Sequence, residues 1–144
     1  EAGSEYIADL FDQSLPNTMI LAEITRVEVA AALAARQRAR SGLTLRERDR
    51  AVALMLRHCD REYRMVPLTP EVLGRAVELT QSHRLRGYDA VQLSAALTTN
   101  NALRTAGLAE LVFVTADNDL IQAAVAEKLP AQNPNTYAQD SIND

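Results

Sequence analysis

Short, largely apolar runs alternate along this chain with segments of helical periodicity, and this alternation limits the folds open to it. The clearest run is 111–115, and strands are also predicted at 18–22, 63–66 and 131–132. Strands that are apolar throughout, rather than at every second residue, are typical of parallel sheets covered by helices on both faces. The sequence therefore predicts an α/β protein, with a three-layer α/β/α arrangement around a central, mainly parallel sheet.

Helix starts and stops complete this prediction. Capping patterns begin helices at Thr25, Thr44 and Thr69, where a hydroxyl precedes a Glu or a Pro at the favoured spacing. A polar stretch at 98–101 is expected to break the helix that precedes it. The predicted helices are 4–13, 25–39, 44–60, 69–83, 88–99 and 118–128.

Length and composition predict one domain. The 144 residues suffice for a single core, and we expect a domain over 1–134 followed by a polar tail at 135–144. Two Phe and no Trp predict an aliphatic core. The lone Cys59 excludes an internal disulfide and fits a reducing compartment. We expect its side chain to pack in the core as a small hydrophobe. No apolar run approaches the roughly 18 to 20 residues of a membrane helix, so we expect a cytoplasmic protein without a membrane partner.

Four carboxylates are predicted where helices begin: Glu28, Asp89, Asp117 and Asp119. Glu28 and Asp117 follow predicted strands, and the carboxyl ends of parallel strands meet at the edge of the sheet where ligands bind. Acids gathered there would repel one another unless a divalent cation lay between them. Each also has a structural interpretation, because Glu28 completes a capping box, Asp89 suits a helix dipole and Asp117 suits an N-cap. The residues by themselves leave both interpretations open.

Arginine is concentrated in the middle of a chain whose net charge is −4. Residues 26–104 carry fourteen Arg against eight acids, whereas both ends are acidic. The group at 36–50 is either a phosphate-binding surface or a solvated helix connection. His58 and His83 are not part of the acidic motifs and are predicted to be surface or packing residues.

Three motifs occur in order along essentially the whole chain: TRVE at 25–28, RGYDAVQLSAA at 86–96 and VTADND at 114–119. In this order and spacing they resemble the PIN-domain ribonucleases, in particular the VapC-type toxins of bacterial toxin–antitoxin pairs. The resemblance implies a PIN-like domain that hydrolyses RNA phosphodiester bonds with Mg²⁺ or Mn²⁺.

The resemblance also assigns roles. It implies that Glu28, Asp89 and Asp117 are metal ligands, and that Asp119 is a supplementary ligand or orients water. It implies a cognate antitoxin protein as partner and a homodimer as assembly. The alternative is a catalytically inactive PIN-like scaffold that binds a protein or RNA.

One departure from the family bears on activity. PIN domains begin with a strand whose Asp supplies a further metal ligand at the centre of the sheet, and this first strand is absent from the printed sequence. We therefore expect reduced or absent nuclease activity for the chain that starts at Glu1.

Overall fold

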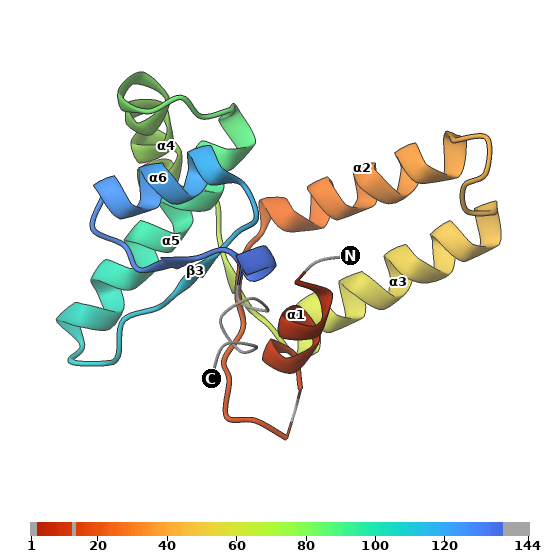
Figure 1. The fold of residues 1–144 in the computed structure, drawn as a ribbon, viewed down its shortest axis with the longest axis horizontal. Helices are drawn as coiled ribbons and strands as arrows, with labels where there is room; N and C mark the ends of the chain where they lie inside the picture. The colour runs from red at the N-terminus through yellow and green to blue at the C-terminus, as the bar shows by residue number, and fades with distance from the viewer. Residues whose placement is uncertain (1–2, 13, 137–144) are drawn as a thin grey trace. The chain divides into compact units, whose positions relative to one another are not determined.

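The computed structural model describes residues 3–12 and 14–136, and most of these residues are helical (Figure 1). The chain divides into two compact units, which are described separately. The hairpin unit is Thr18–Leu68, and the terminal unit combines Glu1–Asn17 with Thr69–Asp144. The domain predicted over 1–134 stays a prediction, and most of the predicted tail, 137–144, lies outside the described residues.

The predicted three-layer α/β/α fold with a central sheet is wrong. In the described residues, β1 (Ile20–Ala22) pairs in parallel with β2 (Arg64–Val66), and β3 (Phe113–Val114) pairs in parallel with β4 (Ala131–Gln132). These are two separate sheets of two strands each, so the described part of the chain has no central sheet. The apolar runs indicated the positions of the strands, but only two or three residues of each run pair. Most residues of the buried apolar cluster lie on helices instead.

The hairpin unit is built from two antiparallel helices between its strands. Helix α2 (Ile24–Arg38) follows β1, and α3 (Leu45–Arg61) returns to β2 (Figure 1). The predicted capping box at the start of α3 is confirmed: Thr44 Oγ1 accepts a bond from the Glu47 backbone N–H at 3.3 Å, and the Thr44 N–H donates to Glu47 Oε2 at 2.8 Å. Cys59 is buried on α3, as predicted for a small core residue.

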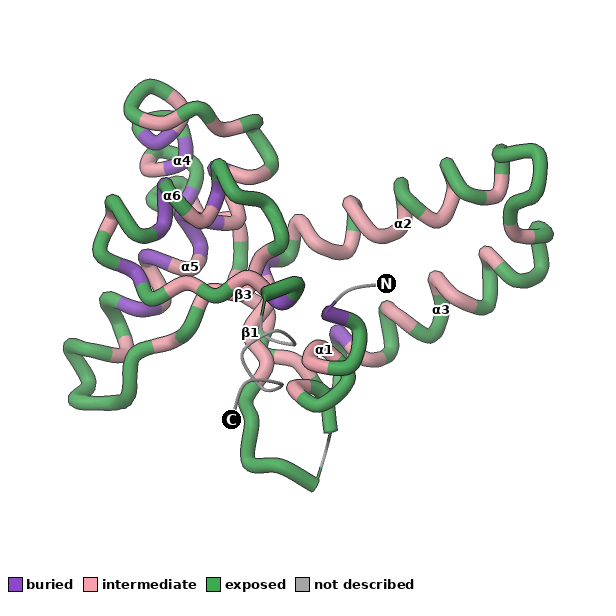
Figure 2. The backbone as a smooth tube through the Cα atoms, in the orientation of Figure 1, coloured by how far each residue is buried: buried purple, intermediate pink, exposed green. Residues whose placement is uncertain are grey.

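The terminal unit contains the main hydrophobic core. Its helices are α1 (Ser4–Leu10), α4 (Pro70–Ser82), α5 (Gly87–Thr105) and α6 (Asn118–Ala126). Figure 2 shows buried positions along α4, α5 and α6. The core is aliphatic, as the composition predicted, and consists of Ala76, Leu79, Ala90, Leu93, Leu97, Leu120, Ala123, Ala124 and Leu129.

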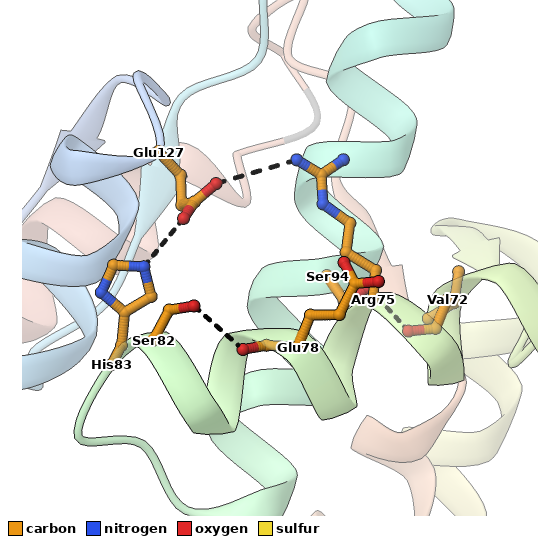
Figure 3. Close-up of polar contacts among 7 residues, drawn as sticks. All are labelled: Val72, Arg75, Glu78, Ser82, His83, Ser94 and Glu127. Atoms are coloured by element: carbon orange, nitrogen blue, oxygen red, sulfur yellow. Dashed lines mark hydrogen bonds and ion pairs between the residues drawn. The ribbon is translucent and has the colours of Figure 1, made fainter.

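The predicted helix break at 98–101 is wrong, because α5 continues without interruption to Thr105. One of the polar residues that suggested the break is used inside the fold: Asn100 is buried, and its Oδ1 accepts a bond from the Leu111 N–H at 3.0 Å. A second buried polar group on α5, the hydroxyl of Ser94, donates to the Val72 carbonyl oxygen at 2.7 Å (Figure 3). Buried polar groups are tolerated in a helix when they find such partners.

Helix α6 ends two residues earlier than predicted, in a left-handed turn. Lys128 has φ of 62°, its N–H donates to the Val125 carbonyl, and the Leu129 N–H donates to the Ala124 carbonyl. This pair of bonds is a Schellman motif, in which the residue in the left-handed conformation is usually Gly. Leu129, the next residue, is buried in the core, so the turn directs an apolar side chain inward.

Candidate carboxylate site and the His83–Glu127 contact

Asp117 and Asp119 lie together at the start of α6. Asp117 is the N-cap, and its Oδ1 accepts a bond from the Leu120 N–H at 3.1 Å. The Asp117 N–H donates to Thr115 Oγ1 at 3.2 Å, which fixes the backbone at the end of β3. Both carboxylates are exposed. An ionised carboxylate has about four acceptor sites on two oxygens, so capping through Oδ1 leaves Asp117 able to bind a second group.

Asp89 occupies the first turn of α5, as predicted. It is the third residue of the helix and is half-buried, and the N-cap, Arg86, makes no side-chain capping bond. A negative charge in this turn is favourable because the helix N-terminus carries a partial positive charge. The helix dipole thus accounts for an acid at this position without a ligand.

Glu28 belongs to the hairpin unit, and the capping box predicted for it is wrong. Helix α2 begins at Ile24 with Glu23 as its N-cap, so Thr25 lies inside the helix rather than before it. The prediction failed because a Thr-x-x-Glu sequence has the spacing of a capping box even when it lies inside a helix. Glu28 is therefore the fifth residue of α2, half-buried, and the capping interpretation does not explain its presence.

The described structure brings Asp117 and Asp119 into one helical turn and places Asp89 on a neighbouring helix of the same unit. Within residues 3–12 and 14–136, no three or more His, Cys, Asp or Glu side chains are grouped so as to hold a metal ion. Mg²⁺ keeps several waters and is usually held by one or two carboxylates together with substrate phosphates. The carboxylates have the oxygen chemistry that Mg²⁺ and Mn²⁺ prefer.

A contact between the ends of two helices was missed by the sequence interpretation. His83 is the C-cap residue of α4 and Glu127 that of α6, and His83 Nε2 lies 2.8 Å from Glu127 Oε1. Arg75 Nη2 lies 3.9 Å from the other carboxylate oxygen, and Figure 3 shows both basic side chains directed toward Glu127. The partners are 44 residues apart in sequence, and no local pattern signals a contact at that separation.

Two open hollows flank this contact. One, of about 570 Å³, lies along α4 and is lined by Glu71, Gly74, Arg75, Glu78, Leu79, Ser82 and Glu127. The other, of about 340 Å³, is lined by His83, Arg84, Asp119, Gln122, Ala123 and Ala126. His83 and Asp119 therefore border the same hollow. The sequence interpretation placed His83 among the surface or packing residues and did not connect it with Asp119.

No model of a known protein family matches this chain, and no curated protein sequence matches it. The likeness to PIN-domain ribonucleases therefore rests on the three motifs. Within the described residues, no helix combines the length and the apolar character needed to cross a membrane.

Proposed function

We propose that this chain is a metal-dependent ribonuclease that hydrolyses RNA phosphodiester bonds with Mg²⁺ or Mn²⁺, as the toxin of a toxin–antitoxin pair. Asp89, Asp117 and Asp119 of the terminal unit are the proposed ligands, with Asp119 supplementary or orienting water. Glu28 is a further proposed ligand on the basis of the motif resemblance alone. A cognate antitoxin and a homodimer are implied by the same resemblance.

The observation that carries this proposal is the position of Asp117 relative to the parallel pair β3–β4. The carboxyl end of β3 leads within three residues to Asp117, whose backbone is held by Thr115 and whose carboxylate stays exposed. Because β3 pairs only with β4 in the described residues, this placement is a property of the connection between β3 and α6 and not of a larger sheet. An exposed, rigidly held carboxylate at this place suits a cation that also contacts a phosphate from solvent.

The chemistry needs a cation and a set of acids to hold it. A divalent cation offsets the charge that gathers on the phosphoryl oxygens and lowers the pKa of bound water toward neutrality. The protein's part is to fix the acids. Asp117 is fixed through its cap bond and its backbone bond to Thr115, and Asp119, in the same turn, lines the hollow that His83 also lines.

The second candidate is a scaffold that binds RNA or a protein without catalysis. It is favoured by the lack of any group of three or more metal-binding side chains in the described parts of the chain. The two candidates differ in acid-dependent metal binding and in cleavage.

The test compares Asp89→Asn with Glu71→Gln. Glu71 occupies the first turn of α4, as Asp89 occupies that of α5, so both substitutions remove one acid from the same kind of position in the same unit. We expect Asp89→Asn to weaken Mn²⁺ binding by tenfold or more, while Glu71→Gln leaves it unchanged. Because the first strand is absent, we expect weak cleavage of a labelled RNA by the parent at most, and Asp89→Asn should remove what there is. Mn²⁺ binding that is equal in both variants and the parent, with no cleavage by the parent, would favour the scaffold. Cleavage that survives Asp89→Asn would overturn the proposed ligand role of Asp89.

A further inference from the structure

The connection between α2 and α3 carries the densest positive charge in the chain. We call residues 36–50 the hairpin tip; it spans the end of α2, the connection and the first turns of α3. Six arginines against two acids, Glu47 and Asp49, give the hairpin tip a charge of +4, so the rest of a chain of net charge −4 carries −8. The six are Arg36, Arg38, Arg40, Arg46, Arg48 and Arg50.

The charge of +4 already counts the two acids of the hairpin tip, and both acids are engaged locally. The Glu47 carboxylate accepts bonds from the Thr44 N–H and hydroxyl at 2.8 and 2.7 Å. Asp49 pairs with Arg48 at 2.6 Å. Among the described residues, the other five arginines of the hairpin tip form no ion pair, and all five are exposed.

Two arginines of the hairpin tip lie at the end of α3 where a cation is unfavourable. Arg46 and Arg48 lie in its first turns, where the partial positive charge of the helix N-terminus disfavours a cation. Acids are favoured at this end of a helix and bases at the other end, and α3 carries the acids Glu47 and Asp49 in the same turns. Arg36 and Arg38, in the last turn of α2, fit that rule, whereas Arg46 and Arg48 do not. The hairpin tip therefore carries cations at a helix end that disfavours them, offset in part by Glu47 and Asp49 in the same turns.

The hairpin tip also stands apart from the strands of its unit. Helix α2 has 15 residues, which at 1.5 Å each extend about 22 Å from β1. The connection lies at the end of the two helices away from β1 and β2, and Figure 2 shows it almost entirely exposed. Guanidinium groups on such a projection can reach several phosphates of one strand, since Arg binds phosphate through two parallel bonds.

We propose that the hairpin tip binds the phosphate backbone of single-stranded RNA. The choice of RNA rests on the proposed ribonuclease function, while the phosphate chemistry rests on the charge and exposure of the hairpin tip. Contacts of this kind position a strand without reading its bases, so the surface holds RNA of any sequence. Affinity is then salt-dependent, with a slope of log K on log salt of about −0.7 for each phosphate neutralised on a single strand.

The test removes three charges from the hairpin tip and three from elsewhere in the same unit. The tip variant is Arg40→Gln, Arg46→Gln and Arg50→Gln together. The control variant is Arg57→Gln, Arg61→Gln and Arg64→Gln, which removes the same charge from exposed positions at the other end of α3 and in β2. The probe is a fluorescent 2′-O-methyl 20-mer in EDTA, so neither metal binding nor cleavage enters the measurement.

We expect the tip variant to lose tenfold or more in affinity at about 100 mM salt, and its salt slope to fall by about 2, three phosphates at about 0.7 each. The control variant should lose less than threefold, and the tip variant should melt no lower than the parent because Arg46 opposes its helix. Equal losses in the two variants, or a parent that does not bind the oligonucleotide at about 50 mM salt, would overturn the inference. If the tip variant loses affinity but the parent binds no Mn²⁺, only the proposed nuclease function is refuted. If the parent binds Mn²⁺ but the tip variant keeps its affinity, only this inference is refuted.

Discussion

Asp117 has two proposed roles that substitutions can separate. Its Oδ1 caps α6 through the Leu120 N–H, and its charge is a proposed metal ligand. Asn caps a helix as well as Asp does but carries no charge, whereas Ala does neither. Asp117→Asn should therefore remove the ligand while keeping the cap, and Asp117→Ala should remove both.

The expected magnitudes follow from these two terms. Asp117→Asn loses only the favourable charge at the N-terminus of α6, about 0.3 to 1 kcal/mol. Asp117→Ala loses the cap bond as well, for a further cost of about 1 kcal/mol. In a chain of this length, 1 kcal/mol corresponds to a fall in Tm of about 3 °C. Both variants should lose Mn²⁺ binding.

The matched control is Thr69→Ala. Thr69 caps α4 through the Val72 N–H at 3.2 Å in the same unit and has no proposed metal role. Thr69→Ala should lower the free energy of unfolding in urea by about 1 kcal/mol while leaving Mn²⁺ binding unchanged. If Asp117→Asn were as unstable as Asp117→Ala, the capping argument would be refuted. If Asp117→Asn bound Mn²⁺ like the parent, the ligand role would be refuted.

Three further predictions concern the turns and caps. Gly42→Ala should destabilise the hairpin by about 1 to 3 kcal/mol in urea unfolding, because a Cβ there would overlap the Arg36 carbonyl oxygen. Gly74→Ala, on open helix surface, should instead stabilise the chain by about 0.5 to 1 kcal/mol. Changes of the same sign in both variants would contradict the account. Lys128→Gly should raise the free energy of unfolding by about 1 kcal/mol by relieving the positive φ, whereas a similar gain from Lys128→Ala, which keeps a Cβ, would refute that reason. The bonds from Thr44 lower the pKa of Glu47 below its ordinary 4.5. The ionised Glu47 carboxylate therefore contributes its full stability above pH 4.5, and this contribution is lost as the pH falls through the lower pKa of the folded state. Glu47→Gln keeps the capping box, so its unfolding free energy should fall less between pH 7 and pH 3 than that of the parent, and an equal fall would exclude this cause.

Local signals predicted the helix starts better than the sheet. The capping box of Thr44 and the Thr69–Pro70 start occur where expected, because each is decided by bonds within four residues. The same rule failed at Thr25, where the chain entered the helix earlier. The sheet could not be predicted because strand pairing depends on which distant segments meet. The runs at 18–22 and 111–115 both contain paired strands, but each pairs with one partner only.

The candidate site was predicted in parts. Asp89 and Asp117 lie in the predicted helix-start positions, since capping and dipole preferences are local. Whether carboxylates on different elements share a cation depends on tertiary placement, which periodicity does not encode. The hollow that His83 and Asp119 both line could not be predicted for the same reason, because it forms only when α4 and α6 have packed.

The central claim is that carboxylates on α5 and α6 serve one cation. Titration of the chain with Mn²⁺, followed by the loss of the free Mn²⁺ electron paramagnetic resonance signal, tests it most directly. The account predicts a site that Asp89→Asn and Asp117→Asn each remove, that Thr69→Ala and Glu71→Gln leave intact, and that Mg²⁺ displaces. Binding that survives both Asp89→Asn and Asp117→Asn, or no binding by the parent chain, would contradict it.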